Sequence, residues 1–413
     1  MMKIVDLIQQ ITMGPFGSDI TVDNFIDEGV PVLNGSNING VKLTEETFRY
    51  VSKEKAILLK KANTKRGDIV ITHRGTLGQI AYIPEDSKYD NYIISQSQFR
   101  VTLKTELVDP IYFTYYFHTS EGQKRLLSFK NHVGVPALAQ ATTNFRLLDF
   151  PYRPIQTQKE IAKVLSDLDA KIELNNKINT ELEAMAKLIY DYWFVQFDFP
   201  DKNGNPYKSS GGKMVYNEEL KREIPVGWES ECLNSLLEFK KGDEPGSKAY
   251  TDRKVNDSFV KFFRVSNING NSDTYIDSSK KVYNYAKEGD VVVTFDGSVG
   301  KVGIGINGAY SSGLRKVYSP TKELKNSLVF LIFKDKRIIK TIHKYSTGSI
   351  ILHASKSIDH LRIPYKKSVY DEFQDIIEPL YEKIVSNIKQ NQKLAELRDW
   401  LLPMLMNGQV KVG

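Results

Sequence analysis

Apolar side chains recur at alternating steps of three and four residues in two long stretches of the chain. That spacing places one side chain per half-heptad on a single stripe, which is typical of two helices wound together. The second stretch repeats the first 212 residues later, with Ala186 against Arg398 as the clear exception. The predicted helix-pair seam consists of Leu165, Leu168, Ile172, Asn175, Asn179, Leu182 and Ile189 in the first stretch, and Ile377, Leu380, Ile384, Asn387, Asn391, Leu394 and Leu401 in the second.

Both stretches carry Asn at the same two places in the seam. An Asn amide among apolar side chains lowers stability but fixes register, because sliding the helices would leave it unpaired. Two unrelated core helices would not be expected to share both positions. Since the Asn residues are central in each run, they line up in parallel and in antiparallel packing alike, so the pattern does not choose between the two.

The ends of both helices are predicted from caps and prolines. Thr157, followed three residues later by Glu160, predicts a capping box at the start of the first helix, and Pro200 predicts its end. In the second stretch, Pro379 is expected in the first helical turn, after a separate short turn over residues 369–377. Pro403 is expected to end that helix.

A mixed pattern of strands and helices precedes each long helix. Apolar runs at 30–33, 68–72 and 99–103 are bounded by Gly, Asn and Asp, which predicts strands, while 110–129 has helical spacing. Part of this pattern recurs: residues 36–40, 67–72 and 75–78 reappear, with close substitutions, at 266–270, 289–294 and 297–300. The sequence therefore predicts two α+β domains with one fold and different surfaces.

A chain of 413 residues is long enough for two or three domains, and the repeat favours two. Residues 198–227 are rich in Gly, Pro and Ser, which predicts a connector rather than a packed element. The predicted segments are a first domain at 1–154, a helix at 155–197, a linker at 198–227, a second domain at 228–367 and a second helix at 368–413.

Charge and cysteine content bound the class of protein without deciding it. A net charge of +7 is compatible with a polyanionic partner but modest for this length. We find no apolar run long enough to cross a bilayer and no signal-peptide stretch after Met1, and the single Cys232 excludes an intramolecular disulfide. A cytoplasmic location is therefore expected.

Several short motifs, in order along the chain, carry a family resemblance. The pattern Gly-Asp, apolar strand, Gly-x-x-Gly occurs twice, each time followed by a heptad helix, and residues 14–18 read Gly-Pro-Phe-Gly-Ser. The region around the first helix adds residues 158–162, Trp193-Phe194, Phe199-Pro200, Gly204, Pro206-Tyr207 and 224–228. Together these features resemble the specificity subunit of a type I restriction-modification enzyme, over essentially the whole chain.

The resemblance implies an α+β fold in which two pseudo-repeated target-recognition domains are separated by two long helices packed as an antiparallel coiled coil. Each domain would read one half of a bipartite target in double-stranded DNA. The subunit would be non-catalytic and dock two modification (methyltransferase) subunits and restriction (translocase/endonuclease) subunits. S-adenosylmethionine, ATP and Mg would be bound by those partners, and no membrane would be involved. A helix of about 39 residues spans about 58 Å, or roughly 17 base pairs, so the helices would act as a ruler.

Catalytic and metal-binding motifs were sought in the sequence as well. Asn205-Pro206-Tyr207 lacks the second proline of a methyltransferase motif and is interpreted as a turn, and the Gly300, Gly303 and Gly305 series as strand. We find no phosphate-binding Gly-rich loop with Lys and Ser or Thr, and no Cys or His cluster with metal-ligand spacing; His343, His353 and His360 fall across probable turns at irregular intervals. The sequence therefore predicts no catalytic and no metal site.

Base reading requires polar side chains that reach groove edges, and Arg and Gln suit guanine and adenine respectively. The loop after each Gly-Asp strand and the next polar strand are the best candidates, although any one of their residues is as readily a solvated strand-edge residue. The candidates are Arg74, Thr76, Gln79, Ser95, Gln96, Gln98 and Arg100 in the first domain, and Ser298, Lys301, Ser311, Ser312, Arg315 and Lys316 in the second.

Two alternatives remain at this point. A self-sufficient methyltransferase or nuclease would need the catalytic motifs that we did not find. A coiled-coil adaptor that binds only proteins would share the helix pattern but would not read DNA.

Overall fold

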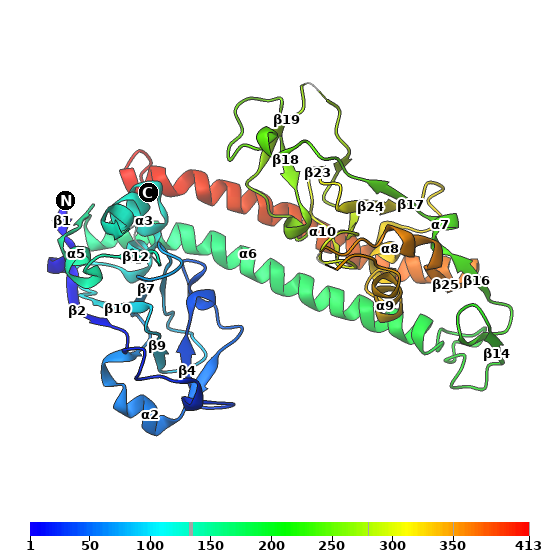
Figure 1. Ribbon diagram of the computed structural model, residues 1–413, viewed down its shortest axis with the longest axis horizontal. Coiled ribbons are helices and arrows are strands. Elements are labelled where there is room, and N and C mark those ends of the chain that lie inside the picture. Colours follow the sequence, from blue (N-terminus) through cyan, green and yellow to red (C-terminus); the bar gives the residue numbers. More distant parts are fainter. Residues whose placement is uncertain (132–134, 280, 350, 413) are drawn as a thin grey trace. The chain divides into compact units, whose positions relative to one another are not determined.

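The computed structural model describes residues 1–131, 135–279, 281–349 and 351–412. The chain divides into two compact units, unit 1 (Met1–Ala170 and Leu394–Gly413) and unit 2 (Lys171–Lys393). Each unit contains one of the two predicted domains and a stretch of both long helices (Figure 1). Gly413, the predicted end of the last segment, lies outside the described residues.

Unit 1 is built on a four-stranded antiparallel sheet and a five-stranded mixed sheet. In the first sheet β10 lies between β2 and β7, and in the second β4 and β9 run parallel. In spatial order the strands are β2 (Ile8–Met13), β10 (Gln98–Leu103), β7 (Ile69–Thr72) and β8 (Ile80–Tyr82), then β3 (Phe25–Ile26), β5 (Arg49–Val51), β4 (Val30–Leu33), β9 (Tyr92–Ile94) and β6 (Asn63–Thr64).

Short helices and two strand pairs complete unit 1. β1 pairs with β13, and β11 pairs with β12. Their bounds are β1 (Met2–Lys3), β13 (Asp149–Phe150), β11 (Lys130–Asn131), β12 (Ala137–Leu138), α1 (Ile4–Leu7), α2 (Lys53–Leu58), α3 (Pro110–His118), α4 (Ser120–Leu126) and α5 (Ala141–Leu147). The predicted strands at 30–33, 68–72 and 99–103 are thus β4, β7 and β10, and the helical region at 110–129 contains α3 and α4.

Unit 2 repeats this topology strand for strand except at one edge. The order β17-β24-β21-β22 matches β2-β10-β7-β8, and β19-β18-β23-β20 matches β5-β4-β9-β6, including one parallel pair. The bounds are β17 (Glu238–Lys241), β24 (Leu314–Tyr318), β21 (Val291–Thr294), β22 (Val302–Gly303), β19 (Tyr275–Asp277), β18 (Phe259–Phe263), β23 (Gly308–Tyr310), β20 (Tyr285–Ala286), β16 (Glu229–Cys232), β25 (Arg362–Tyr365), α7 (Leu233–Leu236), α8 (Asn326–Ile332) and α9 (Lys336–Lys344). The predicted duplication of an α+β fold is confirmed.

The repeated Gly-Asp motif is explained by an ion pair inside each unit. Asp68 is buried and accepts hydrogen bonds from Thr102 Oγ1 (2.5 Å) and Lys65 N (3.0 Å), while Arg100 Nη1 lies 3.6 Å from its carboxylate. In unit 2, Asp290 pairs with Lys316 Nζ at 3.3 Å in the equivalent place. Each pair links the start of one central strand to its neighbour in the sheet.

The two long helices are α6 (Ile155–Tyr190) and α10 (Lys367–Asn407), and their ends differ from the prediction. Helix α6 starts two residues before Thr157, so the expected capping box is wrong. The buried Gln158 instead ties the helix start down, because its amide donates to Arg153 O (2.7 Å) and Leu107 O (3.0 Å). After Tyr190, a π-helical turn (Asp191–Val195) follows.

Helix α10 runs without interruption through both of its prolines, so the predicted break at Pro379 and the predicted end at Pro403 are wrong. A proline inside a helix removes one hydrogen bond and leaves the carbonyl four residues earlier without its partner. Both prolines are exposed, so those carbonyls face the solvent side of the helix. Water can satisfy them there, and the helix tolerates the residues.

In unit 2, the Asn residues of the seam pair in antiparallel order. Asn175 Nδ2 donates to Asn391 Oδ1 (2.8 Å), and Asn387 Nδ2 donates to Asn179 Oδ1 (2.8 Å). The repeat converts each of these pairs into the other, as expected of a pseudo-two-fold arrangement. The side chains of all fourteen predicted seam residues are buried or half-buried. The antiparallel packing implied by the resemblance is therefore present in this unit.

Unit 1 holds the remaining parts of both helices, and Arg398 there has its own partner. Its Nη1 donates to Asp169 Oδ1 at 2.6 Å, and Tyr115 OH of α3 donates to the other oxygen of that carboxylate at 2.5 Å. Arg398 stands where the first helix has Ala186, the clear exception to the helix repeat. Through Asp169, this cation joins the parts of both helices in unit 1 to the domain.

The predicted linker at 198–227 is a packed element rather than a plain connector. It contains a hairpin of β14 (Met214–Asn217) and β15 (Arg222–Pro225). Phe199 and Trp228 are buried, with Trp193 and Phe194, in the core of unit 2, and Phe199 stacks on Tyr207 with ring centroids 4.9 Å apart. The turn interpretation of residues 205–207 holds.

The Asn pairs predict a non-additive effect on stability. Asn387→Leu should lower the free energy of unfolding by about 1–3 kcal/mol, because the buried Asn179 amide loses its partner. Asn179→Leu combined with Asn387→Leu should recover most of that loss. Urea unfolding of the full chain, followed by circular dichroism, measures both effects. Ser386→Leu, at an exposed neighbouring position, is the control; equal destabilisation by this control would contradict the account.

The buried ion pair of unit 1 predicts a contrast between two arginines. Arg100→Met should cost about 3–5 kcal/mol of stability, since it leaves the Asp68 charge buried without its counterion. Arg74→Ala, at an exposed position, should change stability by less than about 0.5 kcal/mol. The same unfolding measurement decides between them, and comparable losses for the two variants would refute the structural role of Arg100.

Candidate nucleic-acid interface

The turn after β7 presents polar side chains at the surface of unit 1. Arg74 and Thr76 are exposed, and between them Gly75 has a φ of +89°, which favours glycine because a Cβ would be strained there. The backbone of this turn is fixed, since Gly75 N donates to Pro136 O at 2.9 Å. The two candidate side chains are therefore held on a defined loop.

A second loop, residues 14–18, is clamped against the turn before β10. Gly14 N donates to Gln98 O at 2.9 Å, and a Cβ on Gly14 would lie 2.0 Å from Ser95 O, so only glycine fits. Gln96 packs over Gly17, with Oε1 2.5 Å from where a Cβ would stand. Unit 2 repeats this close approach, since a Cβ on Gly242 would lie 2.2 Å from Ser311 O.

These loops surround a hollow of about 1100 Å³, which we call the basic hollow of unit 1. It is lined by residues 10–19, 55, 58–62, 73, 74 and 96. Four of its side chains are cations, namely Lys55, Lys60, Lys61 and Arg74, and none of them is in an ion pair with another described residue. Asp19 is the one acid of the lining.

His73 adds a neutral group to the basic hollow. Burial, aided by the nearby Arg74 cation, lowers the pKa of His73, while a contact of Nε2 with Gln96 O (3.2 Å) acts in the opposite direction. The ring is therefore uncharged at neutral pH. It can take part in hydrogen bonding, but it adds no positive charge to the four cations.

Three other candidates of unit 1 are tied up inside the domain. Arg100 is held by Asp68, as described above. Gln98 is fully buried, with Oε1 accepting from Ser95 N at 3.0 Å. Gln79 is held by Thr72 Oγ1 at 3.1 Å and by Gly35 O at 3.0 Å. Fewer candidate residues are therefore exposed at the hollow than the sequence predicted. Arg74 and Gln96 line it. Thr76 is exposed two residues after Arg74, and Ser95, next to Gln96, is half-buried.

The candidates of unit 2 divide in the same way. Ser298 and Lys301 are exposed and Ser312 is half-buried. Ser311 and Arg315 are buried, and Arg315 donates from Nη1 to Ser312 O (2.6 Å) and from Nη2 to Ser355 Oγ (3.0 Å). Lys316 is occupied by Asp290, as described above. The contacts of Arg315 and Lys316 within unit 2 thus indicate a structural role for both side chains.

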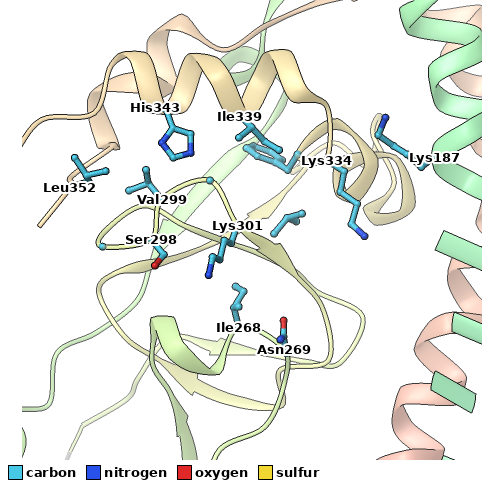
Figure 2. Close-up of a pocket in the computed structure, with 14 residues that line it drawn as sticks. Lys187, Ile268, Asn269, Ser298, Val299, Lys301, Lys334, Ile339, His343 and Leu352 are labelled. Atoms are coloured by element: carbon cyan, nitrogen blue, oxygen red, sulfur yellow. The ribbon is translucent and has the colours of Figure 1, made fainter. Parts of the chain in front are cut away.

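Ser298 and Lys301 line a hollow of about 670 Å³ in unit 2 (Figure 2). Figure 2 shows their loop lying against the helix α9, which carries Ile339 and His343. His343 thus lies in a helix and not in a turn as expected. The remaining lining residues are Lys187, Ile268, Asn269, Gly297, Val299, Gly300, Val302, Phe333, Lys334 and Leu352.

The two units differ at equivalent glycines of this loop. In unit 1, Gln123 of α4 holds the loop against the helix, since its Nε2 donates to Gly78 O at 2.9 Å. In unit 2, Gly300 faces Ile339 and Ile342, each 3.7 Å from where a Cβ would stand, and His343 Nε2 at 3.8 Å. The charge at the preceding turn also differs: exposed Arg74 is matched by Asp296, which His353 Nδ1 contacts at 2.7 Å. One fold therefore presents two different polar surfaces.

Sequence reasoning missed part of the basic hollow. Lys55, Lys60 and Lys61 come from a segment between strands that the analysis did not single out, although the adjacent lysines at 60 and 61 were a visible signal. Neither Lys334 nor His343 was assigned to a surface with Lys301. These groups meet only because the fold joins distant loops.

Metal and membrane sites were examined on the described part of the chain. Within those residues, no group of three or more His, Cys, Asp or Glu side chains is placed to hold a metal ion. In the same ranges, no helix combines the length and apolar character needed to cross a bilayer.

Known proteins share both the sequence pattern and the fold. The chain is 25% identical over 389 residues to the type I restriction enzyme MjaIX specificity subunit of Methanocaldococcus jannaschii, covering 90% of this chain and 85% of that protein. It is 23% identical over 407 residues to the HindI specificity subunit of Haemophilus influenzae, covering 84% and 87%. The crystal structure of a type I restriction-modification S subunit from M. genitalium has a similar fold, with a TM-score of 0.54 at 16% identity, covering 98% of this chain and 95% of that one.

A family match covers most of both repeats. Residues 19–184 and 225–394 each match the type I restriction modification DNA specificity domain. The two matched segments contain most strands of the sheets described above, without β1 and β2, and most of both long helices. The chain therefore belongs to the family of type I restriction-modification specificity subunits.

Proposed function

We propose that this chain reads a bipartite target in double-stranded DNA for a type I restriction-modification complex, one half with each unit. The observation that carries the proposal is the pair of equivalent turns, which keep their backbone but exchange exposed Arg74 for Asp296. Two domains that bind different DNA sequences with one fold need the same backbone and different exposed side chains.

The electrostatics of unit 1 support DNA as the ligand. Four cations line one hollow without an ion-pair partner among the residues that the structure describes, and phosphates would release their counterions on binding them. Gln96 lies at the same surface and has the donor and acceptor pair that adenine recognition uses. The net charge of the whole chain is modest because its 50 acidic residues nearly balance its 57 basic ones, so the local surplus is the more informative quantity.

We propose further that the chain is non-catalytic and docks two modification subunits and restriction subunits, which would bind S-adenosylmethionine, ATP and Mg. The long helices also carry exposed apolar side chains, which a docked subunit would cover. On α6 and α10 these are Leu174, Met185, Leu188, Ile376, Leu397 and Trp400. The absence of catalytic motifs noted in the sequence agrees with this division of labour.

A domain exchange tests the proposal. The chain is co-expressed with its modification subunits, and methylated positions are mapped across a whole genome. Replacing residues 1–154 by the matching domain of a relative with a different target should change one half of a split methylation motif and leave the gap and the other half unchanged. Replacing 228–367 should change only the other half.

The control is an assembled complex shown to bind S-adenosylmethionine. If such a complex methylates without sequence preference, or if either exchange alters both halves together, the proposal fails. A complex that forms but never binds DNA would favour the adaptor alternative instead.

A further inference from the structure

The basic hollow of unit 1 is also lined by the exposed apolar side chains Met13, Phe16 and Leu58, of which Phe16 is aromatic. Phe16 is 83% exposed, among the most exposed of the large apolar side chains in the described residues. It lines the same hollow as Lys60, Lys61 and Arg74. An aromatic ring kept in water costs solvation free energy, so its position calls for a partner that covers it.

Phe16 is presented by a stiff loop. Pro15 precedes it and fixes its own φ, and Gly14 is pinned to Gln98 as described above. Phe16 N donates to Asp19 Oδ2 at 2.8 Å, and Asp19 N donates back to Phe16 O at 2.9 Å. Because the backbone is already ordered on both sides, little conformational entropy remains to be lost when the ring meets a ligand.

The charges around the ring select the ligand. A protein surface that covered Phe16 would also have to neutralise four cations, whereas a nucleic acid offers stacked aromatic bases flanked by phosphates. Apolar side chains such as Phe insert between base pairs in proteins that bend DNA, partly unstacking one step. Gln96, which packs over Gly17 of the same loop, lines the same hollow and carries an amide suited to reading a base.

Unit 2 has no equivalent ring. After Gly242, the counterpart of Gly14, the loop continues with Asp243 and Glu244. Asp243 Oδ1 pairs with Lys281 at 3.1 Å, and Glu244 accepts from Tyr250 OH at 2.9 Å. Two carboxylates at this place would repel phosphates, so the feature belongs to unit 1 alone.

We propose that Phe16 is a wedge that inserts into one base step of the half-site read by unit 1, so that this half is selected partly by how easily that step unstacks. The inference rests on the proposed function. Flexible pyrimidine–purine steps unstack most readily, and such a step is expected at the contacted position. The half-site read by unit 2 is not deformed in this way.

The experiment uses the complex of the full chain with its modification subunits. Duplexes carrying the mapped target have 2-aminopurine, whose fluorescence rises on unstacking, placed in turn at each position of both half-sites. Methyltransferase subunits take their target adenines out of the stack, so increases at those adenines are set aside. At the remaining positions the unaltered complex should give an increase at one step, in the half assigned to residues 1–154 only. Phe16→Ala should abolish it and weaken binding about tenfold, the size of one lost stacking contact. Phe16→Trp should retain both.

Val22→Ala is the matched control, because Val22 is 79% exposed in the same unit but does not line the hollow. Outside the target adenines, an increase that persists in Phe16→Ala, or sequence-specific binding with no increase at any such position, would overturn the wedge while leaving the proposed function intact. Loss of complex assembly in Phe16→Ala would also overturn it, in favour of a protein contact. If the unaltered complex does not prefer the mapped target over a scrambled duplex, the proposed function fails as well.

Discussion

The register of the antiparallel helix pair is the constraint on which this architecture depends. Buried amides in an apolar seam can be satisfied only where they face one another, and in unit 2 Asn175 meets Asn391 while Asn179 meets Asn387. Each alternative register would bury an amide against Leu or Ile at a cost comparable to a lost hydrogen bond. The helices thus trade some stability for a single alignment, and each unit contains part of both.

The sequence repeat predicted the duplicated fold because it preserved the features that backbone geometry requires. The Gly-Asp pairs recur since Asp68 and Asp290 each anchor a neighbouring strand through a cation, and the glycines recur at turns with positive φ. Helix ends were predicted less well. A proline on an exposed helix face is tolerated because water can bind the carbonyl, four residues earlier, that the proline leaves without a partner. The proline alone does not reveal which face of the helix is exposed.

The sequence placed the candidate turns and strands better than it predicted which of their side chains are exposed. A polar residue on a strand looks like a reader of bases until its partner is known, and the partner of Arg100 lies 32 positions away in Asp68. The basic hollow was only partly foreseen for the same reason, since Lys60 and Arg74 come together through the fold. What distinguishes the units is local: Arg74 against Asp296, Gln123 against Ile339, and Phe16 against Glu244. Those exchanges are the physical basis on which one framework could read two different half-sites.

A disulfide test of the helix register addresses the central claim most directly. In a Cys232→Ser background, Leu182→Cys is paired either with Ile384→Cys, which faces it in the antiparallel order set by the Asn pairs, or with Leu394→Cys, its equivalent in a parallel pair. The two partners lie about 15 Å apart along α10, beyond the reach of one disulfide. Oxidation of the full-length monomer should join 182 to 384 and leave the 182 and 394 pair reduced. Rapid joining of 182 to 394 instead would contradict the antiparallel register and the account built on it.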